Sequence, residues 1–172
     1  MNEIPGTRVE NGMVLFWGSI FSNFHPCQIK TPGVTFNCSE QYFMYYKALH
    51  FNDVNIARQI LAQTKPGKQK ALGRKVKGFD EFEWSKVRYG YMLDACRAKF
   101  EQNRDLCRVL LSTYPLTLVE ASEFDDVWGI KLGMDDPLAW DKSTWRGLNL
   151  LGQVLMEVRE EILKCQSYNI DV

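Results

Sequence analysis

An apolar stripe near the C-terminal end of the chain limits its fold more than any other feature of the sequence. The stripe consists of Leu151, Val154, Leu155, Val158 and Ile162. Residues at this spacing lie on one face of an α-helix, and the charged residues between them lie on the other faces. Such a helix is stable mainly because its apolar face packs against other elements. We therefore expect a folded core that is built around helices.

Residues that favour helix starts divide the rest of the chain into further helices. Asn37 with Glu40, and Asp80 with Glu83, have the spacing of capping boxes. Further helix starts are predicted at Asn52 or Asp53, at Pro66 and at Asn103. The predicted helices cover residues 38–50, 54–63, 66–73, 82–102 and 104–113, besides the one that carries the stripe.

Short strands are predicted at residues 13–17, 28–30, 34–36 and 116–121, and a turn at 31–33 joins the second to the third. The expected fold class is therefore mainly α, that is, α+β with a few short strands. We expect a single compact domain over residues 13–165. It lies between a loose N-terminal arm, residues 1–12, and a C-terminal tail, residues 166–172.

The composition narrows the classes of function. The 172 residues include 21 Lys and Arg against 21 Asp and Glu, so no net charge draws the chain to nucleic acid or to a membrane. No apolar run reaches the ~20 residues of a membrane helix, and the N-terminal end lacks the apolar stretch of a signal peptide. The five cysteines and two histidines lack metal-site spacing. We expect a cytoplasmic chain with reduced cysteines, no metal ion and no cofactor.

One predicted helix carries two charged residues on an apolar face. The face consists of Glu40, Phe43, Met44 and Lys47. Partial burial there shifts the pKa of a carboxylate or an amine towards neutrality, as acid–base catalysis requires. For each residue a structural interpretation competes with the catalytic one. Glu40 caps the helix together with Asn37, or Lys47 lies at a solvated helix edge.

Two other segments are candidates for ligand contacts. Asp125 precedes Trp128 by three residues in a predicted loop, where a carboxylate holds a sugar hydroxyl and an indole stacks on a base. The competing interpretation is an acidic surface loop that a core tryptophan anchors. A basic run consists of Lys65, Lys68, Lys70, Arg74, Lys75 and Lys77. It either receives a phosphate or pyrophosphate or forms a solvated basic face.

Several short motifs, in a consistent order, resemble the NADAR family, also called YbiA-like. They lie at residues 21–24, 39–47, 71–76, 84, 97–103, 120–122, 125, 128–130, 147–152 and 155–159. The resemblance runs from about Phe16 to Leu163 and implies a compact, largely helical domain with N-glycosidase activity. Two positions depart from the family pattern. Lys131 stands where a second glycine is expected, and Tyr46 stands where many relatives carry glutamine.

The resemblance also implies roles for individual residues. Glu40, Lys47, Trp84 and Asp125 match positions that are taken as catalytic, and Lys47 matches a lysine proposed to attack the anomeric carbon of an opened ribose. The positions expected to shape the substrate pocket are Asn23, Arg74, Trp128, Gly129 and Asn149. A direct route, in which two carboxylates stabilise the oxocarbenium ion and activate water, competes with the covalent lysine route.

The resemblance implies two groups of substrate. One is ADP-ribose attached to guanine, in a nucleotide or in nucleic acid, and the other is the phosphoribosylamino-pyrimidines of riboflavin synthesis. Of the two we favour ADP-ribosylated guanine. A module that binds ADP-ribose without turnover is a third interpretation, which the presence of Glu40, Lys47 and Asp125 disfavours. A purely structural helical protein is a fourth. No obligate protein partner is implied.

Overall fold

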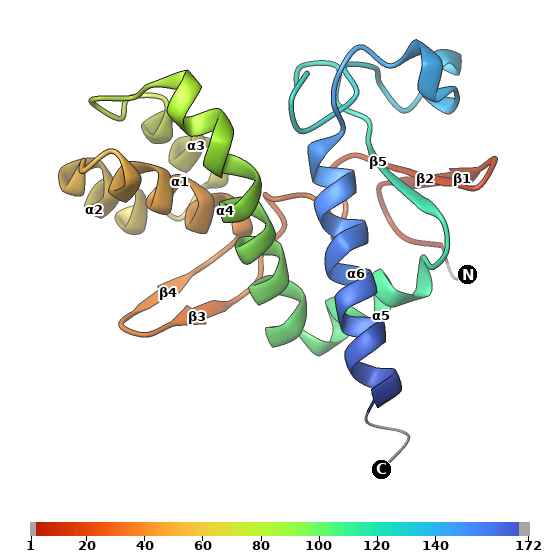
Figure 1. The fold of residues 1–172 in the computed structure, drawn as a ribbon, viewed down its shortest axis with the longest axis horizontal. Helices are drawn as coiled ribbons and strands as arrows, with labels where there is room; N and C mark the ends of the chain where they lie inside the picture. Colours follow the sequence, from red (N-terminus) through yellow and green to blue (C-terminus); the bar gives the residue numbers. More distant parts are fainter. Residues whose placement is uncertain (1–2, 169–172) are drawn as a thin grey trace. The chain divides into compact units, whose positions relative to one another are not determined.

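The structure, a computed structural model, describes residues 3–168 and has the expected fold class (Figure 1). In this range the helices are α1 (Ser39–His50), α2 (Val54–Ala62), α3 (Pro66–Gly73), α4 (Glu81–Gln102), α5 (Arg104–Ser112) and α6 (Leu150–Tyr168). The strands are β1 (Thr7–Glu10), β2 (Met13–Phe16), β3 (Ile29–Thr31), β4 (Val34–Phe36) and β5 (Thr117–Glu120). Two short 3₁₀ helices, η1 (Pro137–Trp140) and η2 (Lys142–Thr144), precede α6. The prediction of a mainly helical chain with a few short strands is confirmed.

The chain forms two compact units. The terminal unit combines residues 1–22 with residues 104–172, and the central unit is the continuous segment 23–103. The hairpin β3–β4 and helices α1 to α4 belong to the central unit. The chain therefore leaves the terminal unit after β2 and returns to it at α5.

The terminal unit contains a three-stranded sheet in the order β1-β2-β5. Strand β1 pairs antiparallel with β2, so the expectation of a loose arm is wrong for residues 7–10. The turn between them has left-handed backbone at Asn11 (φ 51°) and Gly12 (φ 75°), the geometry that an Asn-Gly pair favours in a two-residue hairpin. Strand β5 pairs with β2 in parallel, and Phe16 lies opposite Glu120.

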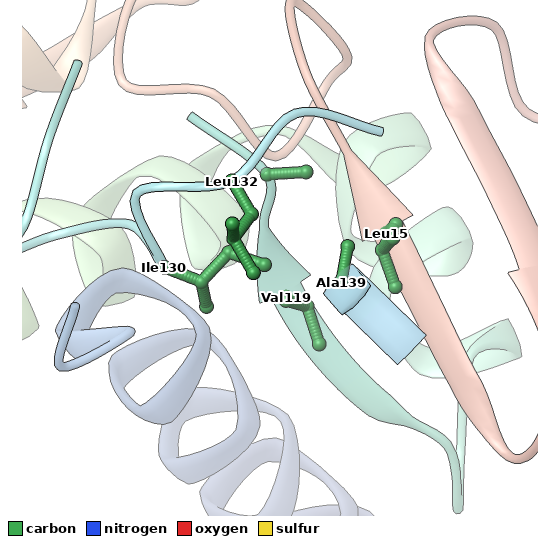
Figure 2. Packing of buried hydrophobic residues seen from close by; sticks show 6 residues of the cluster. Leu15, Val119, Ile130, Leu132 and Ala139 are labelled. Carbon is green, nitrogen blue, oxygen red and sulfur yellow. The ribbon is translucent and has the colours of Figure 1, made fainter. Parts of the chain in front are cut away.

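Apolar residues from distant parts of the terminal unit form its core. Figure 2 shows Leu15 of β2 and Val119 of β5 in one buried cluster with Ile130, Leu132 and Ala139. The stripe on α6 is also buried: Leu151, Val154, Leu155 and Val158 are at most 2% exposed. Ile162 is only half-buried. The predicted stripe thus identifies the helix face that packs inward.

The last helix is longer than expected. It ends at Tyr168, so the prediction of a tail from residue 166 is wrong for residues 166–168. Residues 1–2 of the expected arm and residues 169–172 of the expected tail lie outside the described range. Within that range, no helix combines the length and the apolar character that a membrane crossing requires.

In the central unit, α1 packs against α2, α3 and α4. The caps predicted for α2 and α4 are confirmed. The Asp53 carboxylate accepts a hydrogen bond from the Ile56 N–H at 3.1 Å and begins α2, and Asp80 accepts one from the Glu83 N–H at 2.8 Å and begins α4. Helix α3 begins at Pro66, whose missing N–H costs nothing in a first turn.

Candidate active site

Helix α1 begins one residue later than the capping-box prediction requires. The N-cap is Cys38, whose Sγ accepts a hydrogen bond from the Gln41 N–H at 3.4 Å. The Gln41 side chain in turn accepts one from the Asn37 N–H at 2.8 Å. The expected pairing of Asn37 with Glu40 is therefore wrong, since Gln41 is the residue that reaches back. Glu40 lies in the first turn and is 4% exposed.

Buried polar groups surround this end of α1. The Asn23 carbonyl oxygen accepts a hydrogen bond from the Glu40 N–H at 3.0 Å, which places Asn23 beside the first turn. Within the described residues, Asn23 Oδ1 and Ser39 Oγ are buried and have no hydrogen-bond partner. A buried polar group of this kind is costly unless a water or a ligand satisfies it. Asn23 was predicted as a pocket residue, whereas Ser39 was missed, although it directly precedes Glu40.

Lys47 lies near the other end of the same helix. Its Nζ is 4.0 Å from the centroid of the Phe79 ring and 5.7 Å from that of Trp84, so it does not lie at a solvated edge. Burial lowers the pKa of the Lys47 amine below its ordinary value. The carboxylates of Glu81 and Glu40 act in the opposite direction, and the Arg74 guanidinium lowers the pKa further.

Trp84 forms an aromatic wall beside Lys47. It is 5% exposed, its ring centroid lies 5.2 Å from that of Phe43, and it stacks on Tyr91 at 5.6 Å. The Tyr91 hydroxyl oxygen also lies 3.2 Å from His50 Nδ1. Trp84 therefore gives the Lys47 amine an apolar neighbour on α4.

The basic run follows α3 into the next loop. Arg74 is the C-cap residue of α3, and it is exposed. Lys65, Lys68 and Lys75 are exposed as well, and within residues 3–168 the structure shows no salt bridge for any of these four cations. Cations without a carboxylate partner are available to a phosphate group.

The other predicted residues lie in the terminal unit. Asp125 Oδ1 accepts hydrogen bonds from the N–H groups of Val127 (3.0 Å) and Trp128 (2.7 Å), and so orders the loop that carries the tryptophan. Gly129 follows at a point of close approach, because a Cβ there would lie 2.9 Å from the Glu120 carbonyl oxygen. A catalytic role for Asp125 stays a prediction.

Asn149 connects the start of α6 to strand β5. Its Oδ1 accepts a hydrogen bond from the Glu120 N–H at 2.9 Å, and its Nδ2 donates one to the Leu118 carbonyl at 3.0 Å. Its backbone is left-handed, with φ 52°, a conformation that asparagine tolerates better than most residues. The structure thus shows a positioning role, and the expected pocket role stays a prediction.

The nine predicted site residues fall into two groups. Asn23, Glu40, Lys47, Arg74 and Trp84 lie in the central unit, around α1. Asp125, Trp128, Gly129 and Asn149 lie in the terminal unit, around the end of β5. Within the described residues, no group of three or more His, Cys, Asp or Glu side chains is arranged to hold a metal ion.

The two departures from the family pattern are both accommodated locally. Lys131 has left-handed backbone, with φ 57°, which explains why glycine suits this position. Its Nζ lies 3.6 Å from the Asp126 carboxylate, and with Arg146 it lines a cavity of about 320 Å³. Tyr46 joins the aromatic cluster of the central unit, 4.5 Å from Tyr42 between ring centroids.

Comparison with known proteins identifies the class. The family model of the NADAR domain matches residues 15–163, a range that includes parts of both units, and the chain belongs to this family. It is 42% identical to Protein irg-1 of Caenorhabditis elegans, over 90% of this chain and 82% of that protein. It is 39% identical to N-glycosidase R617 of Acanthamoeba polyphaga mimivirus, over 83% and 86% of the two chains.

Two further relatives extend this comparison. The chain is 32% identical to Riboflavin biosynthesis protein VVA0006 of Vibrio vulnificus, over 87% of this chain but only 37% of that longer protein. The solved NMR structure of YbiA from Escherichia coli aligns with a TM-score of 0.75 and 31% identity, over 94% of this chain and 91% of that one. Curated YbiA of the same organism is named an N-glycosidase.

Proposed function

We propose that this chain, a hydrolase of N-glycosyl bonds, releases ADP-ribose from guanine in nucleotides or nucleic acid. The observation that carries the proposal is the environment of the Lys47 amine. It is half-buried against Phe79 and Trp84, and burial lowers its pKa, so the neutral amine forms more readily than on an exposed lysine. A neutral amine is the form that attacks carbon.

Lys47 is the nucleophile of the proposed reaction. Its nitrogen bonds to C1′ of the ribose while the C1′–N bond to the base breaks, and the electron pair of that bond goes to the base nitrogen, which takes up a proton. The C1′–O4′ bond then breaks and the ring opens: its electron pair goes to O4′, which takes up a proton that the Lys47 nitrogen has released, and the nitrogen lone pair forms the Schiff base between C1′ and Nζ. Water then hydrolyses the Schiff base and returns the free amine, so that one difficult step is divided into two easier ones.

Glu40 is the proton-handling residue in this proposal. It lies two turns before Lys47, about 10 Å along the helix axis. Side chains on a helix lean towards its N-terminus, which brings the long Lys47 side chain back towards Glu40. The Asn23 amide and the Ser39 hydroxyl lie at the same helix end, and their buried oxygens are suited to sugar hydroxyl groups.

The cations of α3 support a phosphorylated ligand. Arg74 acts electrostatically on Lys47, so a phosphate bound by Arg74 lies close to the reacting sugar. The cations beyond it, which include Lys75, provide for a second phosphate, as in the diphosphate of ADP-ribose. A phosphoribosylamino-pyrimidine shares the C1′–N bond and the 5′-phosphate. The name of the Vibrio vulnificus relative keeps this substrate as the second candidate.

Trapping with borohydride tests the proposal. The protein is incubated with ADP-ribosylated guanosine, free guanine is measured, and the mixture is reduced and digested with trypsin. We expect guanine release and a sugar-derived mass increase on the peptide that contains Lys47. Lys47→Arg should lose both, since a guanidinium is not a nucleophile at this pH. Lys86→Arg is the matched control, because the Lys86 Nζ also lies over a ring, 3.8 Å from the Phe82 centroid.

Three outcomes contradict parts of the proposal. An active Lys47→Arg variant excludes the covalent route and leaves the direct attack of water. A kcat/KM tenfold or more higher on a phosphoribosylamino-pyrimidine overturns the choice of substrate. Tight binding of ADP-ribose without guanine release supports the binding module.

A further inference from the structure

One ion pair on α4 differs from the others on that helix. Arg88 Nη1 donates a hydrogen bond to Glu81 Oε1 at 2.9 Å, across two helical turns. The Arg88 side chain is 16% exposed and that of Glu81 is 65% exposed. By contrast, Lys86–Glu83 joins residues one turn apart, and the Lys86 side chain is 49% exposed. Packing therefore holds the Arg88 guanidinium in place, and Arg88 in turn orients the Glu81 carboxylate.

Glu81 lies in the segment that covers the Lys47 amine. Phe79 and Trp84, the two rings that Lys47 Nζ faces at 4.0 and 5.7 Å, flank Glu81 in the sequence. Asp80, which follows Phe79, is the N-cap of α4, so Glu81 is the first residue of the helix. Glu81 thus lies in the sequence between the two residues whose rings face the amine, and its carboxylate acts electrostatically on Lys47.

The charged groups that act on Lys47 come from three elements. They are Glu81 from α4, Glu40 from α1 and Arg74 from the end of α3. Among them Glu81 has the largest effect on the pKa of Lys47, which it raises, and burial opposes it. The described residues of α2 and β4, which also pack on α1, contribute no charged group to this set.

We propose that Glu81, held by Arg88, is a positioning residue for the reaction: the pair sets how readily the Lys47 amine gives up its proton. The inference rests on the proposed function of Lys47 as the nucleophile. Arg88 attracts the Glu81 carboxylate and partly neutralises it, which limits how strongly Glu81 holds the proton on Lys47. The two residues therefore act on Lys47 in opposite directions.

The opposite signs make the test specific. Glu81→Gln removes an anion near Lys47, so half-deprotonation of the amine should move to lower pH. Arg88→Met leaves Glu81 without its cation, so the midpoint should move to higher pH, and the double variant should lie between the two. We expect shifts of about 0.3 to 0.5 pH unit, as for a screened charge several ångströms away. Arg88→Lys keeps the cation and should restore the wild-type midpoint.

The midpoint is measured on the whole protein by the rate of Lys47 acetylation with acetic anhydride, from peptide masses between pH ~6 and ~10. Glu83→Gln, which removes a neighbouring carboxylate of the same helix, is the control and should leave the midpoint unchanged. Shifts below about 0.2 unit, or in the same direction for both variants, overturn the inference.

The pH profile of kcat/KM separates this inference from the proposed function. Its acid limb should follow the acetylation midpoint in each variant. If the midpoint moves as expected while the acid limb stays, Glu81 and Arg88 control the proton on Lys47, but Lys47 is not the nucleophile. The inference then stands and the covalent route of the proposed function fails.

Discussion

Gly73 at the end of α3 and Met44 of α1 approach so closely that a Cβ at position 73 would lie 2.0 Å from the Met44 Sδ. Met44 is 7% exposed and shares its helix face with Glu40 and Lys47. The close packing at this glycine therefore brings the C-cap residue Arg74 to the helix that carries the proposed nucleophile.

Gly73→Ala should destabilise the protein by about 1–3 kcal/mol, since Met44 must leave its rotamer to make room. The measurement is the free energy of unfolding in urea. Gly67→Ala is the matched control, because Gly67 lies in the same helix with no atom within 4 Å of its Cβ position. That variant should be neutral or more stable by up to about 1 kcal/mol, as expected for alanine in a helix. Equal losses in the two variants would contradict the packing argument.

Glu40→Gln and Asp125→Asn should each lower kcat by about 10²–10⁴-fold, the size of an acid–base contribution. Both changes remove a charge and keep the shape. In the Asp125→Asn variant the new side-chain amide still offers an oxygen to the N–H groups of Val127 and Trp128, so circular dichroism spectra should match the wild type. Wild-type rates in both variants would show that these carboxylates are not catalytic.

Arg74→Ala should raise KM about tenfold for a phosphorylated substrate, through loss of a charge-assisted hydrogen bond. Added salt should also raise the wild-type KM modestly, because it screens the attraction between Arg74 and the phosphate. Lys68→Ala, one turn and a half earlier on α3, is the control and should have a smaller effect. A substrate without phosphate should be indifferent to Arg74→Ala, and equal activity with and without the phosphate would contradict the assignment.

Lys47 should cost the protein stability at neutral pH. Its pKa in the folded state lies below that of the unfolded chain, so the unfolded chain binds more protons and stability rises with pH between the two values. Lys47→Met should therefore stabilise the protein near pH 7, and the gain should disappear as the pH rises through about 10.4. Urea unfolding of the wild type and of the variant at several pH values measures the difference.

Local signals account for most of the fold. Asp53, Pro66 and Asp80 begin their helices as predicted, because a cap depends on neighbours within a single turn. The start of α1 was misplaced by one residue, since Cys38 is a rarer cap than asparagine and its thiol is held by Gln69, far along the chain. Strand β1 was missed, although Asn11-Gly12 is a strong hairpin signal.

The candidate site could be predicted only in part. Glu40 and Lys47 share a helix face, which the spacing alone shows. Phe79 and Glu81 come to Lys47 through the packing of α4 on α1, which no local pattern encodes. Asn149 was expected in the substrate pocket, and the structure shows that its side chain forms hydrogen bonds with the backbone of β5. Sequence motifs do not distinguish such a contact within the protein from a contact with a ligand.

The parallel pairing of β2 with β5 has a consequence for biosynthesis. Residues 23–103, which form the central unit, are translated between these two strands. Contacts within that segment can form on the ribosome as soon as it emerges, since domains fold as units and the N-terminal ones fold first. β2 can pair with β1 at once, but its other edge waits for residues 117–120. A nascent chain that stalls after residue 103 therefore carries the proposed nucleophile while it exposes an unpaired strand edge, which is a site of aggregation.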